Sequence, residues 1–494
     1  MSRPLDLGEH FADHVGVSDS PSVAELLEWL AARDAVIAEQ AAVIEALRGQ
    51  LAVAQAEIAE LKRRLGLNSS NSSLPPSLDG PVKPAPKSLR GRTGKKSGGQ
   101  TGHPGRTLSQ VDTPDKTIVH APVACEGCGS GLGDAPAVGV ARRQVFEVPE
   151  PNVTVTEHQI VSRRCGCGAV TAGQAPAGVQ APVQYGPRAQ ALIVYLVVGQ
   201  FLAQQRAAEA MDDLFGLPVC DGTVAAVIAC HAGRLDGFID LVKTRLREAE
   251  VVNADETGLR VAGRTHWVHS TSTDKFSLIS VHRRRGREGI DAHGVLNGYT
   301  GVIVHDAWRP YDCYRDAAHA LCNSHLLREL QQVIDVCDEP GRAWAEQARH
   351  ALLELNTLAA AAAETGRDVD PVRLAQLRSW YTSAAATGIT ANDHRSTKIA
   401  QRHHALARRM FDRVDDYLRF ATDLRVPFTN NAAEREVRMV KLRQKISSCM
   451  RTLTGARHFT RIRSYLATAR KHGITILDAL NRLAQDQPWL PAAS

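Results

Sequence analysis

Three acidic residues that lie far apart in the chain have the contexts that metal-dependent phosphoryl transfer requires. Asp255 lies within an apolar run with the character of a strand, Asp306 ends a second such run, and Glu434 lies in a segment with helical spacing. Moving a phosphoryl group between oxygens needs an activated hydroxyl and neutralised charge, which two divalent ions about 3.5–4 Å apart can supply. Mg²⁺ and Mn²⁺ take carboxylate and phosphate oxygens as ligands. We therefore expect Asp255, Asp306 and Glu434 to form one Mg²⁺ (or Mn²⁺) site.

The apolar runs around the two aspartates predict strands of one sheet. In chain order, the expected elements are strands at 251–261, 266–272 and 276–282, a helix at 286–296 and a strand at 301–306. Three antiparallel strands followed by a helix and a further strand is the order of a ribonuclease-H-like α/β fold. In this order the first and the last of these strands are neighbours, so Asp255 and Asp306 can meet.

The third acid must come from a helix, which is expected to begin at Thr429 or Asn430, because either side chain can cap it. Glu434 and Arg438 share one face at i, i+4 spacing. Glu436 lies about 160° away from Glu434 on a wheel of 3.6 residues per turn, so only one of the two glutamates can face the metal ions. Glu434 has two interpretations here, as a metal ligand or as a surface partner of Arg438.

The size and composition indicate a multidomain α+β protein. The chain has 494 residues, of which 44% are apolar and 23% charged, and at roughly 100–200 residues per domain it forms about three or four structural units. We expect no membrane span, because no apolar run reaches the roughly 18 residues that one needs. The N-terminal residues lack the layout of a signal peptide, which predicts a cytoplasmic protein.

Residues 20–66 carry a seven-residue apolar repeat that predicts a coiled coil. Its first seam consists of Val23, Leu30, Ile37, Ile44, Leu51, Ile58 and Leu65. The second seam consists of Leu26, Leu47, Ala54 and Leu61, and is interrupted by Arg33 and Gln40. Because only a partner helix covers so narrow a stripe, we expect a homo-oligomer. The alternative is a single amphipathic helix packed on its own domain.

A flexible basic linker is expected at 67–112. It begins with a cluster of Ser, Asn and Pro residues that breaks the helix, and the remaining composition has little to bury. No acid occurs at 80–111, whereas the basic residues there are Lys83, Lys87, Arg90, Arg92, Lys95, Lys96 and Arg106. Such a run attracts phosphate backbones through counterion release. A solvated linker without a partner fits the same composition.

Four cysteines lie in the segment 113–180, which is predicted to be β-rich because apolar and polar residues alternate at 145–161. They form two closely spaced pairs, Cys125 with Cys128 and Cys165 with Cys167. In a reducing compartment such spacings indicate metal ligands rather than disulfides. Four thiolates can close a tetrahedral Zn²⁺ site that stabilises a small β domain. His120 is a substitute ligand, and four unrelated reduced cysteines are the alternative.

The segment 185–247 is predicted to be helical and has the outline of a helix-turn-helix. A helix at 206–215, a turn at 216–218 and a second helix from Asp221 to about Gly233 follow one another. The second helix of such a motif enters the major groove of DNA, although ordinary helical domains share the outline.

The C-terminal region, 451–494, is also predicted to be helical and is basic. Its basic residues include Arg457, Arg461, Arg463, Arg470 and Lys471. Two interpretations fit them: they line bound DNA, or they form a solvated face.

Several motifs, in this order along the chain, resemble transposases of the insertion sequence 66 family (TnpC type). The matching segments are 67–77, 98–103, 185–187, 254–258, 306–311 and 430–435, together with the cysteine-bearing unit. The Asp-Glu-Thr segment at Asp255 and the Asn-Asn-x-x-Glu-Arg segment at Glu434 are highly specific together. Cys322 and His325 match a Cys-x-x-His element of the family, to which we assign a structural role near the active site.

The resemblance implies a Mg²⁺-dependent transposase with a ribonuclease-H-like catalytic core at 248–338 and 427–450. It also implies a helical insertion between the second Asp and the Glu, expected at 339–426. Its partners would be DNA, namely terminal inverted repeats and target DNA, and small accessory transposition proteins, in the nucleoid-associated cytoplasm of a bacterium. One departure is that Cys165 and Cys167 enclose one residue, where the family usually has two.

Two other functions fit parts of the sequence. A non-catalytic copy, decayed or domesticated, would bind and assemble on DNA without cutting it, but all three acids are present. A ribonuclease-H-type nuclease outside transposition would hydrolyse without joining strands, and the long N-terminal portion argues against it.

Overall fold

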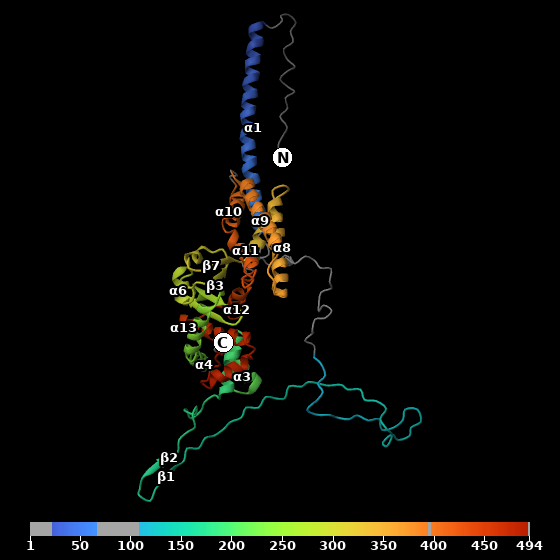
Figure 1. Ribbon diagram of the computed structural model, residues 1–494, viewed down its shortest axis with the longest axis vertical. Helices are drawn as coiled ribbons and strands as arrows, with labels where there is room; N and C mark the ends of the chain where they lie inside the picture. The colour runs from blue at the N-terminus through green and yellow to red at the C-terminus, as the bar shows by residue number, and fades with distance from the viewer. Residues whose placement is uncertain (1–21, 67–107, 394–396, 493–494) are drawn as a thin grey trace, which may run out of the picture. The chain divides into compact units, whose positions relative to one another are not determined.

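The computed structural model of the protein describes residues 22–66, 108–393 and 397–492 (Figure 1). These residues form two units. One contains the long N-terminal helix with 327–353 and 375–413, and the other contains the remaining described residues. The linker predicted at 67–112 lies almost entirely outside the described residues, so it stays a prediction.

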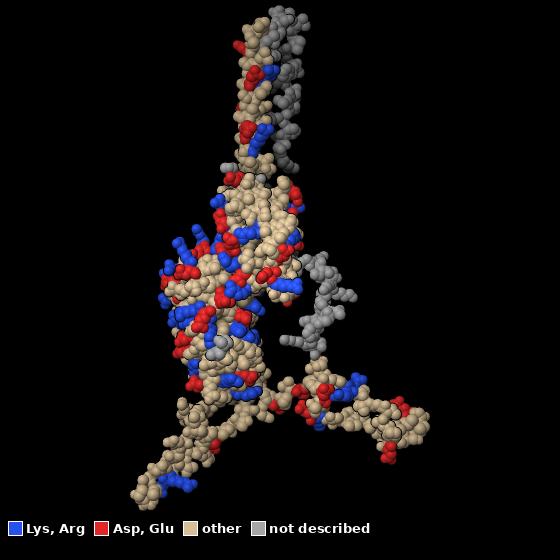
Figure 2. Space-filling view, in the orientation of Figure 1, with Lys and Arg blue, Asp and Glu red and all other residues tan. Residues whose placement is uncertain are grey.

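Helix α1 (Val23–Gly66) confirms that the heptad segment is helical. Residues of its first seam are exposed, at 44% for Leu30, 53% for Ile37 and 49% for Ile44. Figure 2 shows this helix mostly in tan, with few charged side chains. The helix is therefore confirmed with its apolar stripe exposed, and the coiled coil stays a prediction.

The segment 113–180 contains less β-structure than predicted. Its strands are β1 (Ser162–Arg164) and β2 (Val170–Ala172), which pair antiparallel. The structure assigns no strand to 145–161, so that prediction was wrong. Pro149 and Pro151 remove two donors from any ladder there. Every residue of the run is exposed, so no core stabilises the alternating pattern as a strand.

The helices that follow confirm the predicted helical segment and its helix-turn-helix outline. They are α2 (Pro187–Val194), the π-helix η2 (Tyr195–Gly199), α3 (Gln204–Phe215), α4 (Asp221–Gly233) and α5 (Asp236–Glu248). Helix α3 ends at Gly216, whose φ of 60° lies in the left-handed region that glycine adopts without strain. The exposed positions of α4 hold Asp, Gly, Ala and Cys residues. Helix α4 therefore presents no basic side chain to a DNA groove.

A five-stranded mixed sheet carries the acidic residues. Its strands are β3 (Val251–Val261), β4 (Arg264–Ser272), β5 (Ser277–His282), β6 (Val302–His305) and β7 (Ala318–Leu321), with helix α6 (Arg287–His293) before β6. The order across the sheet is β5-β4-β3-β6-β7. Strands β3, β4 and β5 are antiparallel to their neighbours, whereas β6 runs parallel to β3 and β7 parallel to β6. The four predicted strands and the helix are confirmed.

Two helices from the C-terminal part of the chain cover strands of this sheet. Helix α12 (Asn431–Ser447) packs on β3 and β4, and α13 (Leu453–Lys471) packs on β5. The hydroxyls of Thr468 and Ser464 accept the backbone N–H groups of Ser277 and Ile279, at 3.1 and 2.8 Å. They close the outer edge of β5, which would otherwise present unpaired ladder groups.

Helices α13 and α14 (Ile476–Ala484) confirm that the C-terminal region is helical, but they change the role of its basic residues. Lys471 and Arg461 donate to backbone carbonyls of neighbouring segments, and Arg463 is 5% exposed. Only Arg457 and Arg470 of the five are exposed. Both earlier interpretations were therefore wrong for these three: Lys471 and Arg461 fasten α13 to neighbouring segments, and Arg463 is buried beside the ring of Phe201.

The region between β7 and α12 is helical, as predicted for the insertion at 339–426. Its helices are α7 (Asn323–Val336), α8 (Ala343–Thr365), α9 (Pro371–Asn392), α10 (Lys398–Asp412) and α11 (Val414–Thr422). Gly388 lets α9 approach Trp344 of α8 closely, because a Cβ at Gly388 would lie 2.7 Å from the indole ring.

Among the described residues, no helix combines the length and the apolar character that crossing a membrane requires.

Candidate active site

Asp255 and Asp306 lie side by side on adjacent strands. Strands β3 and β6 run parallel with Asn253 opposite Val304. Two residues further along both strands, Asp255 comes next to Asp306, which directly follows β6. Both aspartates are half-buried, so a ligand can reach them from solvent. The structure thus brings the first two predicted acids together, as the predicted strand order required.

Glu434 approaches this pair from α12, and Asn430 fixes the start of that helix. The Asn430 side chain donates to the Ala254 carbonyl at 2.7 Å and accepts from the Asn253 amide at 3.0 Å. Asn430 is 1% exposed, so water does not compete for these bonds. It stands at the N-cap position but makes no side-chain cap bond. The predicted capping role of Thr429 or Asn430 was therefore wrong, because Asn430 binds β3 instead.

Asp255 is the electrostatic centre of the acidic group. Burial raises the pKa of Asp255 well above its usual range, and the carboxylates of Glu256, Asp306 and Glu434 raise it further. All four influences disfavour the ionised form. Asp306 and Glu434 are therefore close enough to Asp255 to raise its pKa.

Among the described residues, basic side chains do not neutralise the aspartates. Asp255 accepts the backbone N–H of Glu256 at 2.9 Å, and Asp306 accepts that of Trp308 at 3.1 Å. In the part of the chain that the structure describes, no lysine or arginine forms a salt bridge with either aspartate.

The donor atoms fit a hard divalent cation, because carboxylate oxygens are the ligands that Mg²⁺ prefers in proteins. Among the described residues, the three carboxylates do not all lie within 4.8 Å of one another. Two ions about 3.5–4 Å apart span a wider set of ligands than one ion does. Glu434 also pairs with Arg438 at 2.6 Å, so both interpretations of Glu434 keep support from the geometry.

Glu256 is a further acid beside the site; it belongs to the Asp-Glu-Thr segment, but no role was predicted for it from the sequence. Its carboxylate accepts from Arg285 at 2.8 Å and from the Tyr311 hydroxyl at 2.7 Å. Burial and the Asp306 carboxylate raise the pKa of Glu256 to about 7, against the lowering effect of Tyr311 and Arg285. Its partners, Arg285 and Tyr311, come from distant segments, so the Asp-Glu-Thr motif alone could not predict its role.

Cys322 and His325 lie against Glu434. The Cys322 thiol donates to Oε1 of Glu434 at 3.9 Å and accepts the N–H of Asn430 at 3.2 Å. Nδ1 of His325 lies 3.8 Å from the same carboxylate oxygen. Burial raises the pKa of the Cys322 thiol to about 11, so near neutral pH this thiol is a hydrogen-bond donor. Both side chains therefore contribute to the position of Glu434.

The two cysteine pairs form similar turns but do not meet. The N–H of Gly129 donates to the Cys125 carbonyl, and that of Gly168 to the Cys165 carbonyl, both at 2.9 Å. In the described part of the chain, no three of the four sulphurs lie within 4.8 Å of one another. The Zn²⁺ site formed by Cys125, Cys128, Cys165 and Cys167 stays a prediction.

Two family models match the chain. A family of unknown function (DUF6444) matches residues 31–109. The model described as transposase IS66 family matches residues 182–458, which include α2, all five strands of the large sheet and α12 with Glu434. No curated protein matches the chain. Because the second match covers more than half of the sequence, the chain belongs to the IS66 transposase family.

Proposed function

We propose that this transposase cleaves DNA and joins 3′-OH ends to target DNA, with Asp255, Asp306 and Glu434 holding two divalent ions. The observation that carries the proposal is the meeting of these acids from β3, the end of β6 and α12. There, the carboxylates of Asp306 and Glu434 raise the pKa of Asp255. An acid such as Asp255, whose pKa is perturbed by burial and by neighbouring carboxylates in an accessible place, is typical of functional sites. The strand order with β3 at the centre supports a ribonuclease-H-like core.

Bound Mg²⁺ would neutralise the phosphate and activate the attacking hydroxyl. Asp255 and Asp306 hold the cation site open from two strands whose spacing the sheet fixes. Glu434 completes it by turning from Arg438 toward the aspartates. Asn430 keeps α12 in register with β3, so this third ligand is presented at a constant place. Positioning and charge neutralisation account for most of the rate in phosphoryl transfer.

Helix α12 also offers positive charge beside the acids. Arg435, Arg438 and Lys445 are exposed, and their spacing places them within one side of the helix. On the face seen in Figure 2, basic and acidic side chains are interleaved, so attraction of DNA depends on local groups such as this one. We assign these three side chains to contacts with DNA phosphates next to the scissile bond.

The other parts of the chain have roles in assembly. The exposed seam of α1 provides self-association into a homo-oligomer. Cys125, Cys128, Cys165 and Cys167 would bind Zn²⁺ once the two turns approach each other. Terminal inverted repeats, target DNA and small accessory transposition proteins are the proposed partners.

The test is a plasmid assay with purified chain. Supercoiled plasmid carrying the ends of the element is incubated with Mg²⁺ or Mn²⁺, and nicks and joined products are mapped. Asp255→Asn, Asp306→Asn and Glu434→Gln should each abolish both products while DNA binding persists. Asp274→Asn and Glu288→Gln replace exposed acids and should keep activity. Products that survive in one of the first three variants would show that its acid is not a ligand.

A further inference from the structure

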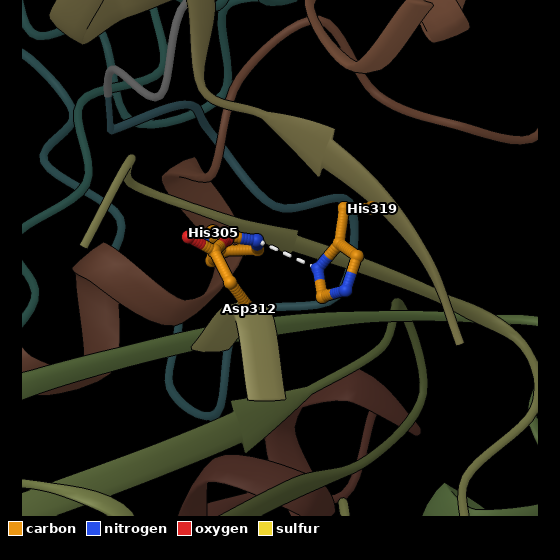
Figure 3. A group of neighbouring side chains, drawn as sticks. All are labelled: His305, Asp312 and His319. Carbon is orange, nitrogen blue, oxygen red and sulfur yellow. Dashed lines mark hydrogen bonds between the residues drawn. The ribbon is translucent and has the colours of Figure 1, made fainter. Parts of the chain in front are cut away.

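Two histidines and an aspartate form a second cluster, next to the acidic group. His305 ends β6, Asp312 lies in the 3₁₀-helix η3 (Arg309–Cys313), and His319 lies on β7 (Figure 3). One ligand atom from each of the three lies within 4.8 Å of the others. The cluster joins three segments directly beside Asp306.

The outer nitrogen of each imidazole is fixed by a backbone carbonyl. Nδ1 of His305 bonds to the Asp306 carbonyl, and Nε2 of His319 bonds to the Tyr314 carbonyl at 3.2 Å. A carbonyl oxygen only accepts hydrogen bonds, so both outer nitrogens carry a proton. In a neutral imidazole the other nitrogen is then an acceptor, which is the form that can bind a metal ion.

The inner nitrogens of the two rings face each other. Nε2 of His305 and Nδ1 of His319 are 3.0 Å apart, as the dashed line in Figure 3 shows. This separation fits either one added proton shared by the rings or a metal ion bound to both nitrogens.

The surroundings favour a metal ion. Imidazole nitrogens and a carboxylate oxygen are common ligands of Zn²⁺, and a set of three protein ligands leaves one position for water. Histidines that bind metal almost always donate their second N–H to a carbonyl or carboxylate, which fixes the tautomer, and both rings do so here. With Zn–N bonds of about 2.0–2.1 Å, two ligands of a tetrahedral site lie ~3.3 Å apart, close to the separation in the structure.

We propose that His305, Asp312 and His319 bind a Zn²⁺ ion, at a site distinct from the carboxylates of Asp255, Asp306 and Glu434. The ion ties the end of β6 to η3 and β7. Because His305 also holds the main-chain carbonyl of Asp306, the site positions this aspartate without touching DNA.

The test measures Zn²⁺ in the full-length chain by equilibrium dialysis and elemental analysis. Wild type should retain one more equivalent than His319→Gln, and Asp312→Asn should weaken that equivalent by at least the roughly 10–100-fold lost when an outer partner of a ligand is removed. Asp312 is exposed, so its variant reports on binding even if His319→Gln folds poorly. Any zinc held by cysteines is the same in all variants and cancels in the comparison.

Two controls separate this site from others. His458→Gln changes a histidine outside the cluster and should leave the zinc content unchanged. Asp255→Asn should also leave it unchanged, whatever happens to DNA cleavage. Equal zinc content and affinity in wild type, Asp312→Asn and folded His319→Gln would overturn the proposal and assign a shared proton to the pair. Loss of the equivalent in Asp255→Asn would overturn its independence from the acidic site.

Discussion

Replacing Asn430 with alanine should detach the start of α12 from β3 and misplace Glu434. The side chain satisfies two buried groups, the Ala254 carbonyl and the Asn253 amide. Leaving a buried polar group without a partner costs about 1–3 kcal/mol. Two such groups give a loss of about 2–6 kcal/mol in the local free energy of opening. Ala254 precedes Asp255, so the strand and helix parts of the site lose their connection together.

The assay is amide hydrogen exchange, followed in peptides from β3 and α12, because exchange reports the free energy of local opening. Thr429→Ala is the matched control: Thr429 is half-buried and precedes the N-cap position, which Asn430 occupies, so its loss should stay within about 0.5 kcal/mol. An Asn253→Ala variant and the double variant complete a cycle, in which contacting residues show a non-additive term. Equal exchange in Asn430→Ala and Thr429→Ala would refute the reasoning.

Three further predictions concern charge, assembly and packing. Without divalent cations, thermal stability should fall as pH rises from about 4.5 through about 7. The reason is that burial and Asp306 raise the pKa of Glu256 to about 7, so the folded chain keeps a proton that the unfolded chain releases. The melting temperature of Glu256→Gln should depend less on pH over this window, and an unchanged dependence would contradict the assignment. Ile37→Asp combined with Ile44→Asp should dissociate the oligomer in sedimentation equilibrium, whereas Ala42→Asp, outside both seams, should not; a mass unaffected by the double change would exclude the seam as the interface. Lys471→Ala should lower the free energy of unfolding in urea by about 1–3 kcal/mol, since Lys471 donates to the carbonyls of Thr273 and Phe276, whereas exposed Arg470→Ala should stay within about 0.5 kcal/mol; a large effect of Arg470 alone would contradict this packing.

The strands that carry the first two acids could be predicted because their signals are local. Asp255 and Asp306 both lie in apolar runs with clear strand character, and the order of elements fixed which strands are neighbours. Strand β7, with four residues, is too short to show alternation. The alternation of apolar and polar residues at 145–161 led to a wrong prediction, because such a segment forms a strand only when one of its faces covers a core.

Side-chain roles were harder to predict than elements, since they depend on partners from distant segments. Asparagine is a common helix cap, yet the Asn430 amide donates to a backbone carbonyl on β3 instead. The charges of Arg463 and Lys471 suggest a solvent-exposed face. Which face of a helix is buried, however, is decided by the segments that pack on it. The spacing of His305 and His319 in the sequence matches no metal-binding motif. The two come together because β6 and β7 run parallel with His305 opposite Leu321, which lies two residues after His319.

The central claim is that Asp255, Asp306 and Glu434 bind divalent ions together, and metal-directed cleavage of the chain tests it most directly. Fe²⁺ with ascorbate and peroxide replaces Mg²⁺, while saturating Zn²⁺ occupies the histidine cluster. The account predicts backbone cuts near all three acids, suppressed by excess Mg²⁺ and lost in Asp255→Asn. Cuts that miss the neighbourhood of Glu434, or that persist unchanged in Asp255→Asn, would contradict it.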